Sequence, residues 1–135
     1  MGLDIKKKEI RDMFEIFDDP MDKYIQIIEL GKKNLGMPQK YKNEKYRIFG
    51  CASMAWVKVE KNKTIYNILI DSDTFIVKGL LSILKYIVDG ATSKEINDLQ
   101  IDSIFYDIGL EDSITSQRTN GFLNALKKIK EQINE

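Results

Sequence analysis

The sequence predicts one α+β domain in which helices cover a small antiparallel sheet of three strands. Two segments with helical periodicity come first, three strand-like segments follow, and the second half of the chain returns to helical periodicity. Segregated runs of this kind favour an antiparallel sheet packed against helices over alternating βα units. The 135 residues fit a single domain spanning 1–135, and a 43% apolar content is ordinary for a folded chain.

The first two expected helices lie on either side of Pro20. Residues 4–17 place apolar side chains at helical spacing, and the acidic pair before Pro20 ends that segment. Asp19 is suited to cap a second helix with Pro20 at its first position. We expect this helix to end between Gly31 and Gly36. The stripe that it should bury consists of Met21, Tyr24, Ile25 and Ile28.

Three strand candidates follow a polar loop at residues 39–45. Residues 46–49 are short, residues 56–60 alternate apolar and charged side chains, and residues 64–70 are rich in branched side chains. The Lys-Asn-Lys at 61–63 predicts a hairpin turn between the last two. These three segments are therefore the expected strands of the sheet.

The second half predicts a central buried helix and then more helical segments. Ser72 or Asp73 is expected to cap the central helix, which runs to about residue 88 and has one narrow polar face. Shorter helical segments are expected at residues 92–99 and 102–108. The last helix should begin at residue 115 or 116. Its expected core residues are Phe122, Leu126, Ile129 and Ile133.

The composition excludes several kinds of site. Because the chain has no histidine, it cannot form a Ser-His-Asp triad, a Cys-His dyad or a histidine-ligated metal site. A single cysteine excludes an intrachain disulfide, a Cys-x-x-Cys redox pair and the usual Cys/His zinc or iron–sulfur sites. Basic and acidic residues number 21 each, which argues against a general nucleic-acid binder.

The same composition indicates a compartment. No apolar run approaches the roughly 20 residues of a membrane span, and the start of the chain lacks the apolar core of a signal peptide. A lone cysteine is typical of a reducing compartment. We therefore expect a cytoplasmic protein that does not enter a membrane. A plastid stroma, holding a mature form without its presequence, is the alternative.

Cys51 is the position with reactive potential. It follows a strand candidate and is surrounded by small residues, among them Gly50 and Ser53, so that a reactive group of another protein could approach closely. With no histidine in the chain, backbone N–H groups, Lys or Arg would have to stabilise its thiolate. The alternative is a buried and inert cysteine, which free cysteines usually are.

Arg118 is expected in the first turn of the last helix, where the macrodipole disfavours a cation by roughly 0.3–1 kcal/mol. One interpretation is that Glu111 or Asp112 neutralises it. The other is that it faces an anionic site such as a cysteine thiolate or a persulfide.

The Asp-Ser-Asp run at 71–73 begins like a calcium-binding loop but lacks the later ligands of such a loop. We assign its two acids to helix capping.

Four segments resemble one known family. Residues 50–56 read Gly-Cys-Ala-Ser-Met-Ala-Trp and resemble the Gly-Cys-Gln-Ser-Gln-Val-Trp signature of the SufE sulfur acceptors. Residues 71–80 are similar to its Asp-Ser-Asp-x-x-Ile-Val-x-Gly-Leu segment, and residues 116–121 to its Pro-Ser-Arg-x-Asn-Gly segment. Tyr24 followed by Ile-Glu-Leu-Gly at 28–31 gives the fourth match. The order and the spacing are preserved.

The resemblance implies a SufE/IscU-like α+β fold and a role in sulfur transfer. SufE proteins accept the sulfane sulfur of the PLP-dependent cysteine desulfurase SufS, stimulate that enzyme, and pass the sulfur to the SufBCD scaffold that assembles iron–sulfur clusters. Cys51 matches the acceptor cysteine, and Arg118 matches the family's arginine near the end of the chain. We expect Arg118 to support the thiolate or persulfide. PLP would belong to the desulfurase, so we expect no cofactor or metal here and a persulfide-carrying partner rather than a stand-alone enzyme.

The departures from the family pattern concern the partners. Ala52 and Met54 replace the two glutamines around the signature serine, and Ser116-Gln117 replaces Pro-Ser. The sequence identifies neither the cognate desulfurase nor the cognate scaffold, and it does not decide whether the protein forms a homodimer. An iron–sulfur scaffold would need about three cysteines, and a cysteine hydrolase would need a base that the chain lacks. The remaining alternative is a regulatory binding module of the same fold with an incidental thiol.

Overall fold

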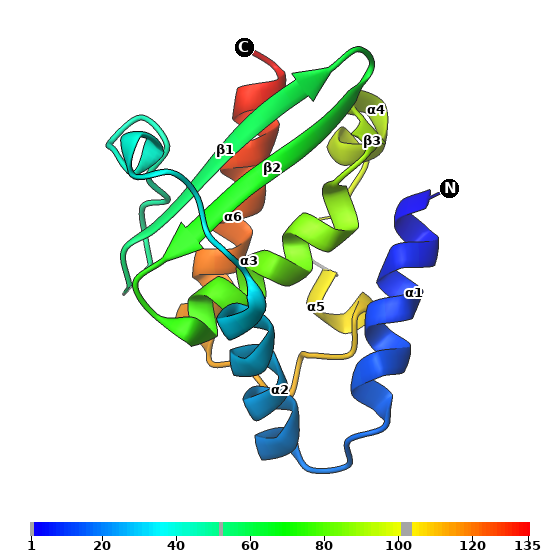
Figure 1. Cartoon of the computed structure of the whole chain (residues 1–135). Coiled ribbons are helices and arrows are strands. Elements are labelled where there is room, and N and C mark those ends of the chain that lie inside the picture. Colours follow the sequence, from blue (N-terminus) through cyan, green and yellow to red (C-terminus); the bar gives the residue numbers. More distant parts are fainter. Residues whose placement is uncertain (1, 52, 101–103) are drawn as a thin grey trace.

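A three-stranded antiparallel sheet in the order β1–β2–β3 organises the fold (Figure 1). In this computed structural model, which describes residues 2–51, 53–100 and 104–135, β1 (Ala55–Asn62) pairs with β2 (Ile65–Ser72). β2 also pairs with β3 (Ala91–Thr92). The structure therefore confirms the predicted α+β class with its three-stranded antiparallel sheet.

The β1–β2 hairpin forms at the predicted place. Its register runs from Ala55 opposite Ser72 to Asn62 opposite Ile65, and the turn lies at residues 63–64 rather than 61–63. Lys63 adopts a φ of 60°, the left-handed conformation that a tight two-residue turn requires.

The third strand is not the one that the sequence predicts. Within residues 46–49 only Arg47 forms a bridge, opposite Trp56, so the expectation of a strand there is wrong. The third strand comes from residues 91–92. Gly90, with a φ of 82°, donates its backbone N–H to Tyr66 O at 2.8 Å and turns the chain back along β2. A strand of two residues is too short to show the alternation of apolar and polar side chains from which strands are predicted.

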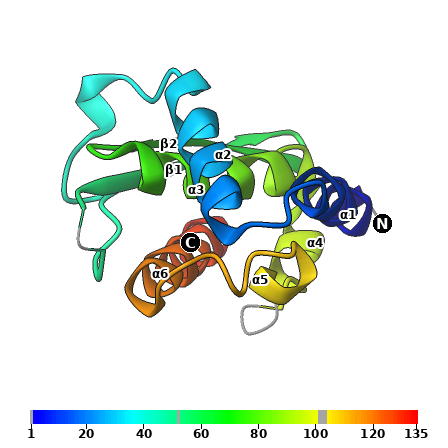
Figure 2. The ribbon, with the colours of Figure 1, turned by 90° about the horizontal axis from the view of Figure 1, so that it is seen from below.

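The helices surround a central one, α3 (Phe75–Val88). The others are α1 (Gly2–Glu15), α2 (Pro20–Lys33), the 3₁₀ turn η1 (Gln39–Tyr41), α4 (Ser93–Asn97), α5 (Ile104–Asp107) and α6 (Ser116–Ile133). α3 packs against β2, α6 packs against β1, and α1, α2 and α6 all contact α3 (Figures 1 and 2). Most of the circumference of α3 is buried, as its apolar sequence predicts.

Of the two predicted helix caps, the cap of α2 is confirmed and the cap of α3 is wrong. Asp19 accepts a hydrogen bond from Met21 N at 2.9 Å, with Pro20 in the first turn of α2, and Thr115 caps α6. Thr74 is the cap residue of α3, so the assignment of that cap to Ser72 or Asp73 is wrong. The helical segment expected at 102–108 is observed as α5, and residues 102 and 103 lie outside the described residues.

The buried face of α2 also differs from the predicted stripe. Tyr24 and Ile28 of that stripe pack partly buried against the core, whereas Met21 and Ile25 are exposed. The fully buried positions of α2 are Ile27 and Gly31. The reason is the crossing with α3: a Cβ on Gly31 would meet the Phe75 backbone carbonyl, and α3 has a glycine of its own against Ile27 O. This glycine-mediated approach of the two backbones decides which face of α2 turns inward. The spacing of apolar residues in the sequence of α2 does not reveal this contact between backbones.

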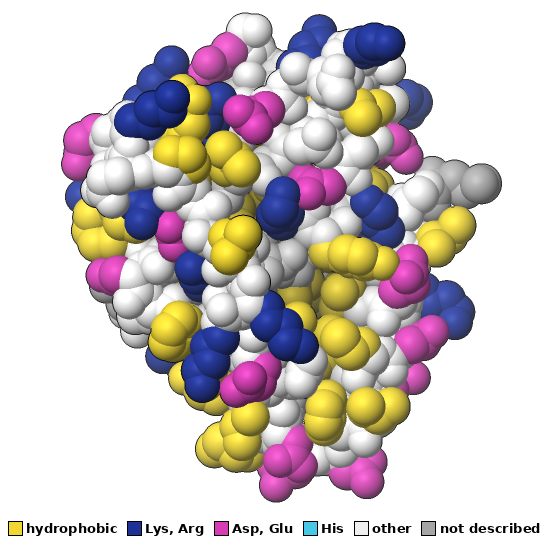
Figure 3. Space-filling model, in the orientation of Figure 1, with side chains coloured by type: hydrophobic (Ala, Val, Ile, Leu, Met, Phe, Trp, Pro, Cys, Tyr) yellow, Lys and Arg dark blue, Asp and Glu magenta, His cyan; other side chains and the backbone are white. Residues whose placement is uncertain are grey.

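None of the helices in the part of the chain that the structure describes is long and apolar enough to cross a membrane. On the face shown in Figure 3, charged side chains of both signs are interspersed and hydrophobic side chains gather between α1 and α2. Ile10, Met13 and Leu30 line a groove of about 380 Å³ there.

Candidate functional site

The Cys51 thiol packs against α6 at Gly121. A Cβ on Gly121 would lie only 2.5 Å from Cys51 Sγ, so that any other residue at this point of the helix would require the sulfur to move. Cys51 is half-buried as a result. The structure therefore brings together two residues that belong to separate motifs in the sequence.

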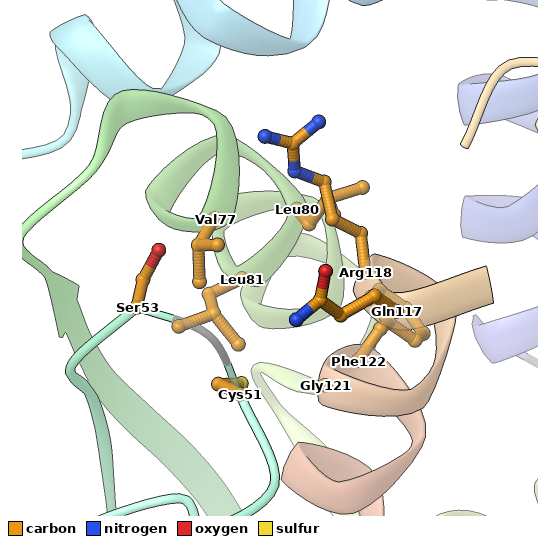
Figure 4. A pocket seen from close by; sticks show the side chains of 9 residues that line it. All are labelled: Cys51, Ser53, Val77, Leu80, Leu81, Gln117, Arg118, Gly121 and Phe122. Atoms are coloured by element: carbon orange, nitrogen blue, oxygen red, sulfur yellow. The ribbon is translucent and has the colours of Figure 1, made fainter. Parts of the chain in front are cut away.

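Cys51 lies in a small pocket between α3 and α6 (Figure 4). The apolar wall consists of Val77, Leu80 and Leu81 from α3 and Phe122 from α6. The polar side chains that line it are Ser53, Gln117 and Arg118. The pocket volume is about 60 Å³, far below the roughly 300–1,000 Å³ of small-molecule sites. A volume of this size fits a few atoms added to Cys51.

The loop before Cys51 is connected to α6 by Asn124. Asn124 Nδ2 donates to Phe49 O at 3.0 Å. Gly50 adopts a φ of 87°, and a Cβ there would collide with the Asn124 amide. Glycine at position 50 therefore serves both the backbone turn and the close approach to the helix. Nothing in the sequence alone indicated Asn124.

The loop after Cys51 is connected to the turn between β2 and α3. Met54 N donates to Asp73 Oδ1 at 3.1 Å, and Asp73 N donates to Met54 O at 3.1 Å. The Ser72 hydroxyl also donates to Met54 O, at 2.7 Å. The acidic run that we assigned to helix capping thus positions the cysteine loop instead. These contacts use the backbone of residue 54, and Ala52 lies outside the described residues.

Asp71, the first acid of that run, is buried and holds a different segment. It accepts hydrogen bonds from Met37 N at 3.2 Å and Ser72 N at 2.8 Å, and forms ion pairs with Lys42 at 2.8 Å and Lys78 at 3.5 Å. Burial alone would raise the pKa of Asp71, but these hydrogen bonds and charges outweigh it and lower the pKa below the ordinary carboxyl value. Asp71 is therefore a structural anion that fixes the segment before η1.

The Cys51 thiol itself has a pKa above the ordinary thiol value. The cause is burial, which disfavours the charged thiolate. The shift favours the protonated thiol over the nucleophilic thiolate at neutral pH.

Arg118 lies on the rim of the same pocket, in the first turn of α6 as predicted. Its guanidinium carbon lies 5.4 Å from the centre of the Tyr24 ring. Figure 4 shows the side chain extending away from Cys51. Among the described residues no ion pair joins Arg118 to Glu111 or Asp112, which are both exposed. The neutralising interpretation therefore has no support in this geometry.

Gln117 lines the pocket next to Arg118. Its side chain is directed into the pocket toward the side where Cys51 lies (Figure 4). In the sequence this residue stood out only as a departure from the Pro-Ser of the resembling family.

Comparison with known proteins gives one consistent result. The family model described as "SufE: Fe-S metabolism associated domain" matches residues 8–133. A SufE-like protein of Rhizobium etli is 34% identical over 128 residues, covering 92% of this chain and 86% of the relative. The sulfur acceptor protein CsdE of Escherichia coli is 31% identical over 129 residues, covering 94% of this chain and 86% of the relative.

The fold has a solved counterpart as well. The solution structure of a hypothetical protein from Thermus thermophilus superposes with a TM-score of 0.78 at 18% identity, covering 96% of this chain and 93% of that one. At this identity the likeness concerns the fold alone.

Proposed function

This chain belongs to the SufE family, and from that premise we propose that it is a sulfur acceptor. It takes the outer sulfur of a persulfide on a PLP-dependent cysteine desulfurase onto Cys51, stimulates that enzyme, and passes the sulfur to a SufBCD-type scaffold for iron–sulfur cluster assembly. The PLP is that of the desulfurase. In this role the chain is a carrier and needs no cofactor of its own.

One observation supports this function best: the half-buried Cys51 thiol opens into a pocket that fits a few atoms, on a loop whose edge is exposed. The neighbouring Phe49 side chain is 54% exposed, which leaves the loop accessible to a partner protein. A hydrolase would need a general base beside the thiol, and the chain has no histidine to supply one. A carrier needs only a nucleophilic thiol and a place for the sulfur that it receives.

The transfer is a thiol exchange. The Cys51 thiolate attacks the outer sulfur of the desulfurase persulfide, a new S–S bond forms on Cys51, and the desulfurase cysteine leaves as its thiolate. The reaction conserves the oxidation state, so neither an oxidant nor a reductant is required. Because burial raises the pKa of Cys51, docking must supply positive charge or move the thiol out of its pocket before attack.

Intact-mass spectrometry after incubation with L-cysteine and a SufS-type desulfurase tests the acceptor function. We expect the wild-type protein to gain the mass of one sulfur atom and to raise desulfurase turnover, and Cys51→Ser to do neither. Transferable sulfur on Cys51→Ser would contradict the assignment of the acceptor. A protein that changes desulfurase turnover equally well with and without Cys51 would instead be the regulatory module with an incidental thiol.

Two further measurements address the partners. Protein loaded with radioactive sulfur should lose its label when a SufBCD-type scaffold is added, whereas retention of the label would argue against delivery to that scaffold. Restoring the family glutamines with Ala52→Gln and Met54→Gln should lower the concentration of this protein that half-saturates the desulfurase, if those side chains contribute to docking.

A further inference from the structure

We propose that Gln117 is the hydrogen-bond donor that binds the outer sulfur of the Cys51 persulfide inside the pocket. The inference rests on the proposed function, because it concerns the state of Cys51 after sulfur has been accepted. It assigns a role to a position at which this chain departs from the pattern of its family.

The geometry of the pocket selects Gln117 among the polar side chains that line it. The Ser53 hydroxyl shares a hydrogen bond of 2.9 Å with the Thr74 hydroxyl, and Figure 4 shows it directed away from Cys51. The Arg118 guanidinium lies over the Tyr24 ring and extends away from Cys51. The Gln117 amide is directed toward Cys51, and no described hydrogen bond engages it. Its two N–H groups are therefore available to a group bound to the thiol.

The remaining walls of the pocket offer few polar groups to a half-buried anion on Cys51. From α3 the pocket receives only Val77, Leu80 and Leu81, and from α6 it also receives Phe122. Arg118 is the one charged side chain among the described residues that line it. An anion placed between apolar walls is costly unless it accepts hydrogen bonds. A donor N–H stabilises the charged form and lowers its pKa.

The loaded state forms by an exchange that balances. The Cys51 thiolate attacks the outer sulfur of a donor persulfide, the donor S–S bond breaks, and the donor leaves as a thiolate. The product carries one S–S–H group, whose proton then dissociates to solvent. Packing against Gly121 leaves little space on the α6 backbone side, so that the added sulfur extends into the pocket where the Gln117 amide lies.

The test measures the pKa of the Cys51 persulfide without any desulfurase. Wild-type protein, Gln117→Leu and Gln117→Glu are loaded with glutathione persulfide, and alkylation of the persulfide by iodoacetamide is followed by intact mass from acidic to neutral pH. Gln117→Leu removes the donor at similar size, and Gln117→Glu replaces it with a carboxylate. Gln39→Leu and Gln39→Glu are matched controls, because Gln39 is exposed on η1 and does not line the pocket.

We expect Gln117→Leu to raise the persulfide pKa by about one unit, which is a tenfold change in its dissociation constant, and Gln117→Glu to raise it further. The Gln39 variants should titrate like the wild type, and all of them should melt normally because both glutamines are exposed. Equal pKa values in Gln117→Leu and wild type would overturn the inference, and so would a wild-type protein that holds no persulfide. If the protein accepts sulfur from glutathione persulfide but not from the desulfurase, the proposed function is contradicted. The titration still decides the role of Gln117 in that case, because it uses no desulfurase.

Discussion

The first third of α6 and its remainder face different parts of the molecule. Residues 116–121 meet the cysteine loop, and their side chains are exposed or half-exposed apart from Gly121, which packs on Cys51. From Phe122 onward the helix mainly supplies the core, with Leu126 and Ile129 fully buried, while Phe122 also lines the pocket and Asn124 holds the loop before Cys51. One continuous helix thus forms both a wall of the pocket and a part of the core.

The difference between the two parts separates stability from chemistry. Side chains in the core part are surrounded on all sides, so their removal leaves a cavity. Side chains in the pocket part contact few neighbours, and their removal should change the behaviour of the thiol more than the free energy of unfolding. Variants in the two parts should therefore have opposite phenotypes, and four predictions test this in order of decreasing effect.

The largest effect is expected for Leu126→Ala in the core part. Truncating a fully buried leucine should lower the free energy of unfolding by about 2–5 kcal/mol. Urea denaturation followed by circular dichroism measures the change. At a temperature where the variant is folded, it should still accept sulfur. A folded Leu126→Ala protein that fails to accept sulfur would contradict the separation of stability from chemistry between the two parts of α6.

Gly121→Ala compared with Gly79→Ala tests what each glycine contacts. A Cβ at Gly79 meets the Ile27 backbone, which cannot move aside, and we expect a loss of about 1–3 kcal/mol from overpacking. A Cβ at Gly121 meets the Cys51 side chain and loop, which can move. Gly121→Ala should therefore change stability by less than about 1 kcal/mol and expose the thiol, so that iodoacetamide alkylates Cys51 faster. Unchanged alkylation with a large loss of stability would mean that the loop is rigid.

Arg118→Ala should alter stability very little. The contact with Tyr24 contributes about 0.5–1 kcal/mol at an exposed site, and relief of the unfavourable macrodipole offsets it by roughly 0.3–1 kcal/mol. Stimulation of the desulfurase should nevertheless be slower, and Arg118→Lys should restore part of it. A large drop in melting temperature with full activity in the cold would show that Arg118 is structural.

The smallest effect concerns the pH dependence of the free thiol. Because burial raises the pKa of Cys51 in the folded protein, alkylation of native protein should reach half its maximal rate at a higher pH than alkylation of urea-unfolded protein. The linked effect on stability has a definite sign: the contribution is present below the pKa of the unfolded thiol and is lost as pH rises through the folded value. Cys51→Ser should lack this alkaline loss, and coincident midpoints would mean that the thiol is already exposed.

Several elements could be predicted because their signals are local. The apolar run of α3, the alternation in β1 and the cap at Asp19 each act over a few residues, and each appears in the structure at its predicted place. The failures have a different origin. The buried face of α2 is decided by a contact between Gly31 and α3, and the third strand by the turn at Gly90.

For this protein the sequence by itself determined the fold class, the reactive cysteine as a candidate, and a resemblance that extends over nearly the whole chain. The tertiary structure decided which residues surround that cysteine. Gly121, Gln117 and Asn124 reach the loop only because α6 folds back against it. Side-chain periodicity reports the environment of a helix face averaged over several turns, whereas a site depends on single contacts between residues far apart in the chain. Those contacts exist only after the chain has packed.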